Sequence, residues 1–164
     1  MLLSDRIDEW MVNHLNEFDG KSLESITRGE LDLGSLDDEK QSTTEKERNE
    51  KDYASVIKQM KEQLGERVKD IRLTSRLTDS PACVVYDKND MSGHMRRMME
   101  AAGHQMPATK PIMELNPEHA ILAKLKAETD DERFNEWSEI LFDQAMLADG
   151  GQLEDPGAFI KRVN

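Results

Sequence analysis

Four histidines and a single cysteine are the side chains of this sequence best suited to bind a transition metal or to act as a nucleophile. A zinc site needs such ligands in pairs only a few residues apart. The histidines lie at His14, His94, His104 and His119, and none of them is at metal-ligand spacing from another or from Cys83. The spacing therefore predicts no metal site. Cys83 lies in a run of β-branched residues, where a buried and unreactive thiol is the expected role.

Other reactive arrangements are also missing from the sequence. Gly150-Gly151 precedes neither a Lys-Ser pair nor a strand-to-helix turn, as a phosphate-binding loop requires. The segment DLGSLDDE at 32–39 lacks a correctly placed glycine and the terminal glutamate of a calcium loop. The carboxylates lie on polar faces of predicted helices, and no nucleophile or base is paired with them. We therefore predict no catalytic, cofactor-binding or metal-binding residues, and no enzymatic activity, in this chain.

A methionine-rich segment offers binding chemistry instead. Residues 91–106, MSGHMRRMMEAAGHQM, contain five of the ten methionines, and Met91, Met95, Met98 and Met99 share one face at helical spacing. Such a face can pack in a core. Because methionine is flexible and polarizable, it can also meet partners of varied shape. The face lacks Leu, Ile and Val, and a glycine weakens the helix, so we favour a binding helix over a core helix.

The composition limits the classes of protein to which the chain can belong. Its 164 residues suffice for one domain with a core, and 37% of them are hydrophobic. The net charge of −12, of which residues 128–155 contribute −9, argues against a nucleic-acid-binding surface. No apolar window reaches the length of a membrane span, and Asp5 and Arg6 interrupt any signal peptide. A lone cysteine fits a reducing compartment, so we predict a cytoplasmic protein that binds neither nucleic acid nor membrane.

Apolar residues recur at helical spacing in six segments. The first spans 4–19. The other five are expected at 53–64, 91–102, 117–127, 131–148 and 156–164. Asn116-Pro117 is expected to start the fourth helix, because proline tolerates a position whose N–H has no helical partner. Thr129 and Glu132 are expected to form a capping box for the fifth.

Two short runs rich in β-branched residues predict strands, VKDIRLT at 68–74 and ACVVYD at 82–87, and PIMELN at 111–116 is expected to form a third strand. KSLESITR at 21–28 is a weaker strand candidate. Residues 29–52 are polar and show no apolar periodicity, so we predict a flexible acidic and polar connector there. Strands and helices alternate irregularly and end in helices. This order predicts the α+β class, with a small mixed sheet and flanking helices.

The helix predicted at 131–148 is apolar around more than half of its circumference. Its main band comprises Phe134, Trp137, Leu141, Ala145 and Ala148, and Ile140, Leu147 and Phe142 widen it. A surface helix needs only a narrower stripe, so the excess must meet either more of the same domain or a second subunit. Together with the last helix, it would form a four-helix bundle in a homodimer; a central helix in a monomer is the alternative. The candidate interface residues are Trp137, Ile140, Leu141, Gln144, Leu147, Phe159, Ile160 and Val163.

Several segments share a family resemblance. The longest are SDRIDEWMVNHLNEFDGK, LGERVKDIRLTSRLTDSPACVV and LEDPGAFIKRVN, with ELNPEHAIL and FDQAMLADGG between them in order. They resemble the C-terminal part of the ninety-kilodalton heat-shock chaperones in their bacterial branch, and they are spread over nearly the whole length of the chain, with no match in detail at 29–52. The resemblance implies a dimerisation domain at 4–164, preceded at 1–3 by a stump of a middle domain. It also implies that ATP and magnesium bind, and ATP is hydrolysed, elsewhere in a longer parent chain.

The resemblance further implies a surface for client proteins. In the family, the methionine-rich segment is an amphipathic helix in the cleft between protomers, and the matching residues here are Met91, Met95, Met98 and Met99. Glu9, Trp10 and Asn13 of the first helix line the same cleft in the bacterial branch, although Trp10 equally suits a core position. We therefore predict a homodimerisation domain of an ATP-dependent chaperone that also binds unfolded or partly folded clients. The alternative is a purely structural dimerisation module whose methionine helix packs internally.

Overall fold

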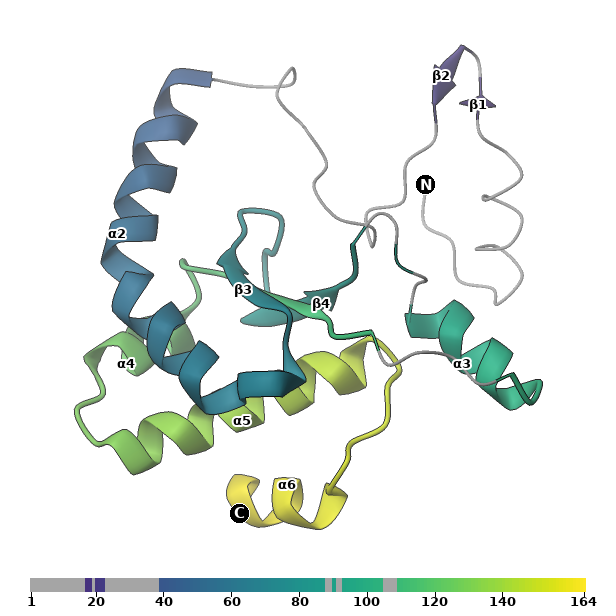
Figure 1. The fold of residues 1–164 in the computed structure, drawn as a ribbon. Coiled ribbons are helices and arrows are strands. Elements are labelled where there is room, and N and C mark those ends of the chain that lie inside the picture. The colour runs from purple at the N-terminus through teal and green to yellow at the C-terminus, as the bar shows by residue number, and fades with distance from the viewer. Residues whose placement is uncertain (1–16, 19, 23–38, 88–89, 91–92, 105–108) are drawn as a thin grey trace.

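The computed structural model describes residues 17–18, 20–22, 39–87, 90, 93–104 and 109–164 (Figure 1). The elements in chain order are β1 (Glu17–Phe18), β2 (Lys21–Ser22), α2 (Glu39–Leu64), the 3-10 turn η1 (Gly65–Arg67), β3 (Asp70–Leu73), β4 (Ala82–Val85), α3 (Gly93–Ala101), β5 (Ile112–Leu115), α4 (Ala120–Ala127), α5 (Asp131–Ala148) and α6 (Pro156–Val163). A small mixed sheet with flanking helices confirms the predicted α+β class.

The three-stranded sheet has β5 at its centre, parallel to β3 and antiparallel to β4. All three strands predicted at 68–74, 82–87 and 111–116 are confirmed, each slightly shorter than expected. Side chains alternate between the two faces of a strand. The register therefore aligns Ile71, Met113 and Val84 on one face, and Arg72, Glu114 and Cys83 on the other. The first face carries the core and the second carries a charged cluster.

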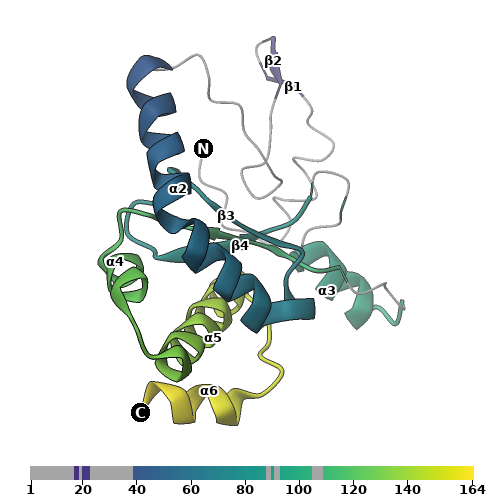
Figure 2. The same cartoon turned by 60° about the vertical axis from the view of Figure 1, so that its left-hand side comes forward.

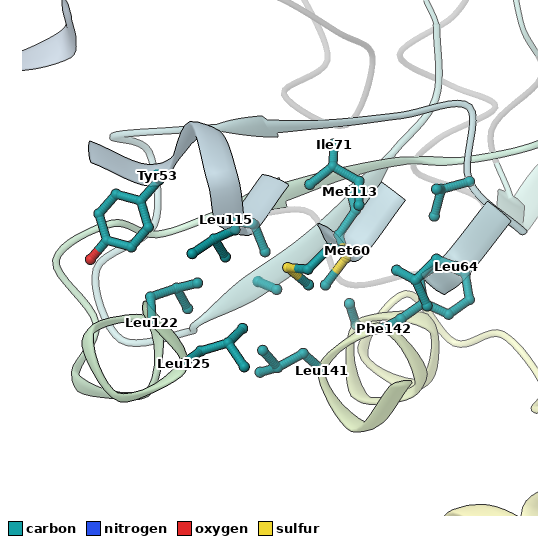
Figure 3. Close-up of a cluster of buried hydrophobic side chains, with 14 of the residues drawn as sticks. Tyr53, Met60, Leu64, Ile71, Met113, Leu115, Leu122, Leu125, Leu141 and Phe142 are labelled. Atoms are coloured by element: carbon teal, nitrogen blue, oxygen red, sulfur yellow. The ribbon is translucent and has the colours of Figure 1, made fainter. Parts of the chain in front are cut away.

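Helices α2, α4 and α5 enclose the core against the apolar face of the sheet (Figure 3). Met60 and Leu64 of α2 point toward Met113 of β5, and Leu141 of α5 closes the cluster from the opposite side. Each such side chain is almost fully buried, which contributes roughly 1.5–3 kcal/mol per residue to folding. The helix predicted at 53–64 is confirmed, and Gly65, at φ +49°, follows its last residue.

Helix α2 begins earlier than predicted, at Glu39. The prediction of a structureless connector is therefore wrong for residues 39–52, while 29–38 lie outside the described residues. The segment is rich in Glu, Lys, Arg and Gln, whose helix propensity is high even without an apolar stripe. Once the packed half at 53–64 forms, adding such residues to its end is favourable because helix propagation is cooperative.

The helix predicted at 4–19 is wrong at its C-terminal end. Glu17–Phe18 pairs antiparallel with Lys21–Ser22, and Gly20 lies between them at φ +75°. The sequence Asp-Gly between the two strands is a strong signal for a two-residue hairpin turn, which outweighs helical periodicity. Residues 4–16, and the predicted stump at 1–3, lie outside the described residues.

Two helices start from caps that differ from those predicted. His119, not Asn116, caps α4, and its Nδ1 accepts a hydrogen bond from Ile121 N at 3.2 Å. Asp130 caps α5 by accepting from Arg133 N at 3.1 Å, in place of the predicted capping box. An aspartate carboxylate competes well for this role because it also complements the positive end of the helix dipole.

Candidate functional site

The most chemically distinctive cluster surrounds Glu114, in the middle strand of the sheet. Its carboxylate is only 3% exposed and accepts hydrogen bonds from Arg72 Nε at 2.9 Å and Nη2 at 2.7 Å, and from Arg76. The Cys83 sulfur lies 3.9 Å from the same carboxylate. Burial, reinforced by the Glu114 charge, raises the pKa of the Cys83 thiol to about 11. A thiol whose pKa is raised in this way is a poorer nucleophile at neutral pH than an ordinary one, which supports a structural role for Cys83.

Alkylation should report this environment directly. We expect iodoacetamide to modify Cys83 in the folded chain roughly 100-fold more slowly at pH 8 than in urea, because the thiolate fraction is far smaller. The folded-state rate should keep rising with pH through pH 10, where the unfolded chain has already levelled off. A time course of mass increase measures both rates. Equal rates in the two states would contradict a raised pKa for this partly buried thiol.

The described residues bring no group of three His, Cys, Asp or Glu together in a way that could hold a metal ion. His119 is used as the cap of α4, and His104 is exposed just beyond Gly103, which has φ +87° after α3. His14 and the side chain of His94 lie outside the described part of the chain. No described helix is both long and apolar enough to cross a membrane.

Helix α5 presents a partly apolar outer face. Trp137 and Leu147 are each 45% exposed, and Gln144 is exposed on the same side, two turns beyond Trp137. The opposite side of the helix faces the core. The apolar arc seen in the sequence is therefore divided between the protomer's own core and an uncovered surface.

Two of the predicted interface residues are not available on that surface. Leu141 is 1% exposed and belongs to the core cluster, and Ile140 is 6% exposed. A side chain buried in its own protomer leaves no area for a second subunit to cover, so Leu141 is corrected from an interface residue to a core residue. Ile140 is buried but does not belong to the core cluster. It lies three residues before Asp143, the α5 residue that pairs with Arg162 of α6.

Helix α6 lies alongside α5 with no fully buried residue of its own (Figures 1 and 2). Asp155 caps it by accepting a hydrogen bond from Ala158 N at 2.9 Å. Ile160 and Val163 are 57% and 54% exposed, whereas Phe159 is partly buried. An eight-residue helix in water is marginal unless packing supports it, so α6 gains from any partner that covers its outer face.

Helix α3 carries the methionine-rich segment and stands apart from the core helices, beside the sheet (Figure 1). It makes few contacts with the other described elements. Met98 is 47% exposed, and Met95 and Met99 are partly buried. Met91 lies outside the described residues, as do Glu9, Trp10 and Asn13.

Two adjacent arginines tie α3 to the rest of the protomer. Arg97 Nη2 donates to the Asp149 carbonyl at 2.6 Å, and its Nη1 lies 3.3 Å from the Asp149 carboxylate, at the C-terminal cap of α5. Arg96 donates to the Thr109 carbonyl at 3.4 Å. These ties occupy the basic side of α3. Sequence reasoning missed them because the partners are far apart along the chain and no local pattern links them.

The whole chain, residues 1–164, matches a protein family described as Hsp90 protein. Similar curated proteins carry the name chaperone protein HtpG. Those of Coxiella burnetii and Nitrosococcus oceani are 53% and 52% identical to it over 164 residues, and that of Burkholderia lata is 54% identical. Each match covers 100% of this chain but only 25–26% of the relative. The chain therefore spans about a quarter of the length of these relatives.

Proposed function

Because the chain belongs to the Hsp90 family, we propose that it is the C-terminal homodimerisation domain of an ATP-dependent molecular chaperone, and that it also offers α3 to unfolded or partly folded clients. The name chaperone protein HtpG, carried by relatives more than 50% identical, supports the chaperone role. ATP and magnesium would be bound, and ATP hydrolysed, by other parts of a longer parent chain in the cytoplasm. This chain itself would form the dimer and bind clients.

The observation that supports dimerisation best is where the exposed apolar side chains lie. Among the described residues, five large hydrophobic side chains are exposed, and four of them come from two neighbouring helices. Trp137 and Leu147 belong to α5, and Ile160 and Val163 to α6. Monomeric proteins rarely leave such apolar surface on adjacent elements uncovered. A second copy placed about a twofold axis would bring the same residues against one another and form a four-helix bundle.

Sedimentation of the purified chain tests the assembly. We expect a concentration-dependent species of twice the protomer mass of 18.8 kDa. The interface residues proposed for it are Trp137, Gln144, Leu147, Phe159, Ile160 and Val163. A chain that remains monomeric at high micromolar concentration would contradict the proposed dimer.

The fifth exposed apolar side chain, Met98, supports a client-binding role for α3. We expect Met98→Gln to change the stability by less than about 0.5 kcal/mol, because the side chain is already half in water. Binding of an unfolded model client should weaken by about fivefold, since the exposed thioether would supply contact with apolar client segments. Fluorescence anisotropy of a labelled client measures the affinity, and thermal melting measures the stability.

Ala123→Gln is the matched control, because it adds the same amide to an exposed position of α4. It should leave client binding unchanged. The purely structural alternative expects a different pattern, in which Met95 and Met99 are core residues of a packed helix. Replacing both by glutamine would then cost roughly 1–3 kcal/mol per buried amide, and client binding would fall only where the chain unfolds. If the double replacement destabilises the chain in this way, and Met98→Gln binds the client with unchanged affinity, the purely structural module is favoured.

A further inference from the structure

Asp143 is a buried carboxylate on α5 that meets two cations from different parts of the chain. Its side chain is only 4% exposed. One oxygen, Oδ1, accepts a hydrogen bond from Arg67 Nη2 at 2.7 Å. The other oxygen, Oδ2, lies 3.6 Å from Arg162 Nη1. One carboxylate therefore links the turn after α2 to the last helix through the middle of α5.

The Arg67 side of this link is fixed by the body of the protomer. Arg67 ends η1, three residues before β3 begins, and also pairs with Glu139, one turn before Asp143 on α5. Its guanidinium lies over the ring of Phe142, with 4.6 Å between the guanidinium carbon and the ring centroid. Phe142 belongs to the hydrophobic core. Arg67 thus holds the Asp143 carboxylate in one orientation.

The Arg162 side of the link belongs to a helix that has few other means of attachment. Arg162 and Phe159 are three residues apart and are both partly buried, so they lie on the side of α6 that faces the protomer. Ile160 and Val163 are also three residues apart, and both are more than half exposed. Because Arg162 pairs with Asp143, its side of α6 faces the protomer, and the side with Ile160 and Val163 faces outward.

We propose that Asp143 is a positioning residue for self-association, which holds Arg162 so that α6 presents Ile160 and Val163 to a second copy of the chain. This inference rests on the proposed dimer, and it adds that the affinity of the dimer depends on the ion pair between Asp143 and Arg162. Arg162 is 30% exposed on its side chain, so dissolved salt screens its attraction to Asp143. High ionic strength then loosens α6 and weakens the dimer, although the contact between subunits is apolar.

Adjacent residues of α6 allow a matched test. Arg162→Gln and Lys161→Gln each remove one positive charge, but Lys161 is exposed and forms no ion pair with the described residues. Sedimentation at about 50 mM and about 500 mM salt gives the dimer dissociation constants. We expect Arg162→Gln to raise the constant about tenfold at low salt, because the ion pair orders α6 within each protomer and both protomers must then order α6 on association, and to remove most of the salt dependence of the constant. The dissociation constant of Lys161→Gln and its salt dependence should match those of the unsubstituted chain.

Charge-preserving rescue separates positioning from packing. Arg162→Lys keeps the cation, so it should return the dissociation constant and its salt dependence to within about threefold of the parent. The inference is overturned if Arg162→Gln behaves like Lys161→Gln, or if Arg162→Lys is as weak as Arg162→Gln while all variants melt at the parent temperature. If the unsubstituted chain is monomeric at both salt concentrations, the proposed dimer itself is overturned.

Discussion

Aspartate in place of Ile160 is expected to convert the dimer into a folded monomer. Ile160 is 57% exposed in the protomer, so the replacement removes little buried area from it. At a subunit contact the new carboxylate would be buried without a partner charge, at a cost of several kcal/mol. A twofold axis would also bring two such charges near each other. Each 1.4 kcal/mol corresponds to a factor of ten, so we expect the dissociation constant to rise by about a thousandfold.

Sedimentation and thermal melting together make this test specific. Ala123→Asp introduces the same charge at an exposed position of α4, and it should leave the assembly intact. Leu141→Asp is unsuitable as an interface probe because Leu141 is 1% exposed and the charge would unfold the core. If Ile160→Asp sediments like Ala123→Asp, the subunit contact lies elsewhere on the molecule.

The contrast between Ile160 and Leu141 shows how far the sequence could define the candidate site. Helical periodicity identified α5 and α6 and showed that α5 is apolar around too much of its circumference for one contact. It could not say which part of that arc the protomer uses, because that depends on where α2 and the sheet pack. Leu141 and Trp137 are both apolar and one helical turn apart, yet one is in the core and the other is exposed.

The fold was predictable where local and tertiary signals agree. The strands β4 and β5 combine β-branched or apolar residues with burial, and the packed half of α2 combines helix formers with an apolar stripe. The prediction failed at 39–52, where good helix formers lack a stripe and composition alone resembles a disordered linker. The pairs that organise the site were beyond sequence reasoning. Arg67 and Asp143 are 76 residues apart, and only the packing of η1 on α5 brings them together.

The largest loss of stability from a single replacement on the charged face of the sheet is expected at Glu114. Its buried carboxylate joins Arg72, on β3, to Arg76, in the segment between β3 and β4. Glu114→Ala removes the charge that both guanidinium groups share. Breaking a buried ion pair by deleting one partner costs about 3–5 kcal/mol. Because both arginines are about a quarter exposed, we reduce the expected loss to about 2–4 kcal/mol.

Thermal melting measures this loss, and we expect the midpoint to fall by about 10 °C for a domain of this size. The melting midpoint of Glu114→Gln should lie between those of Glu114→Ala and the unsubstituted chain, because the amide keeps one hydrogen-bond acceptor but loses the charge. Glu118→Ala removes a carboxylate from an exposed position just beyond the same strand, and its melting should stay close to that of the parent. If Glu114→Ala melted within about 2 °C of the parent, the arginines would be stabilised by other groups. The buried carboxylate would then contribute little to holding β3 and the segment after it on the central strand.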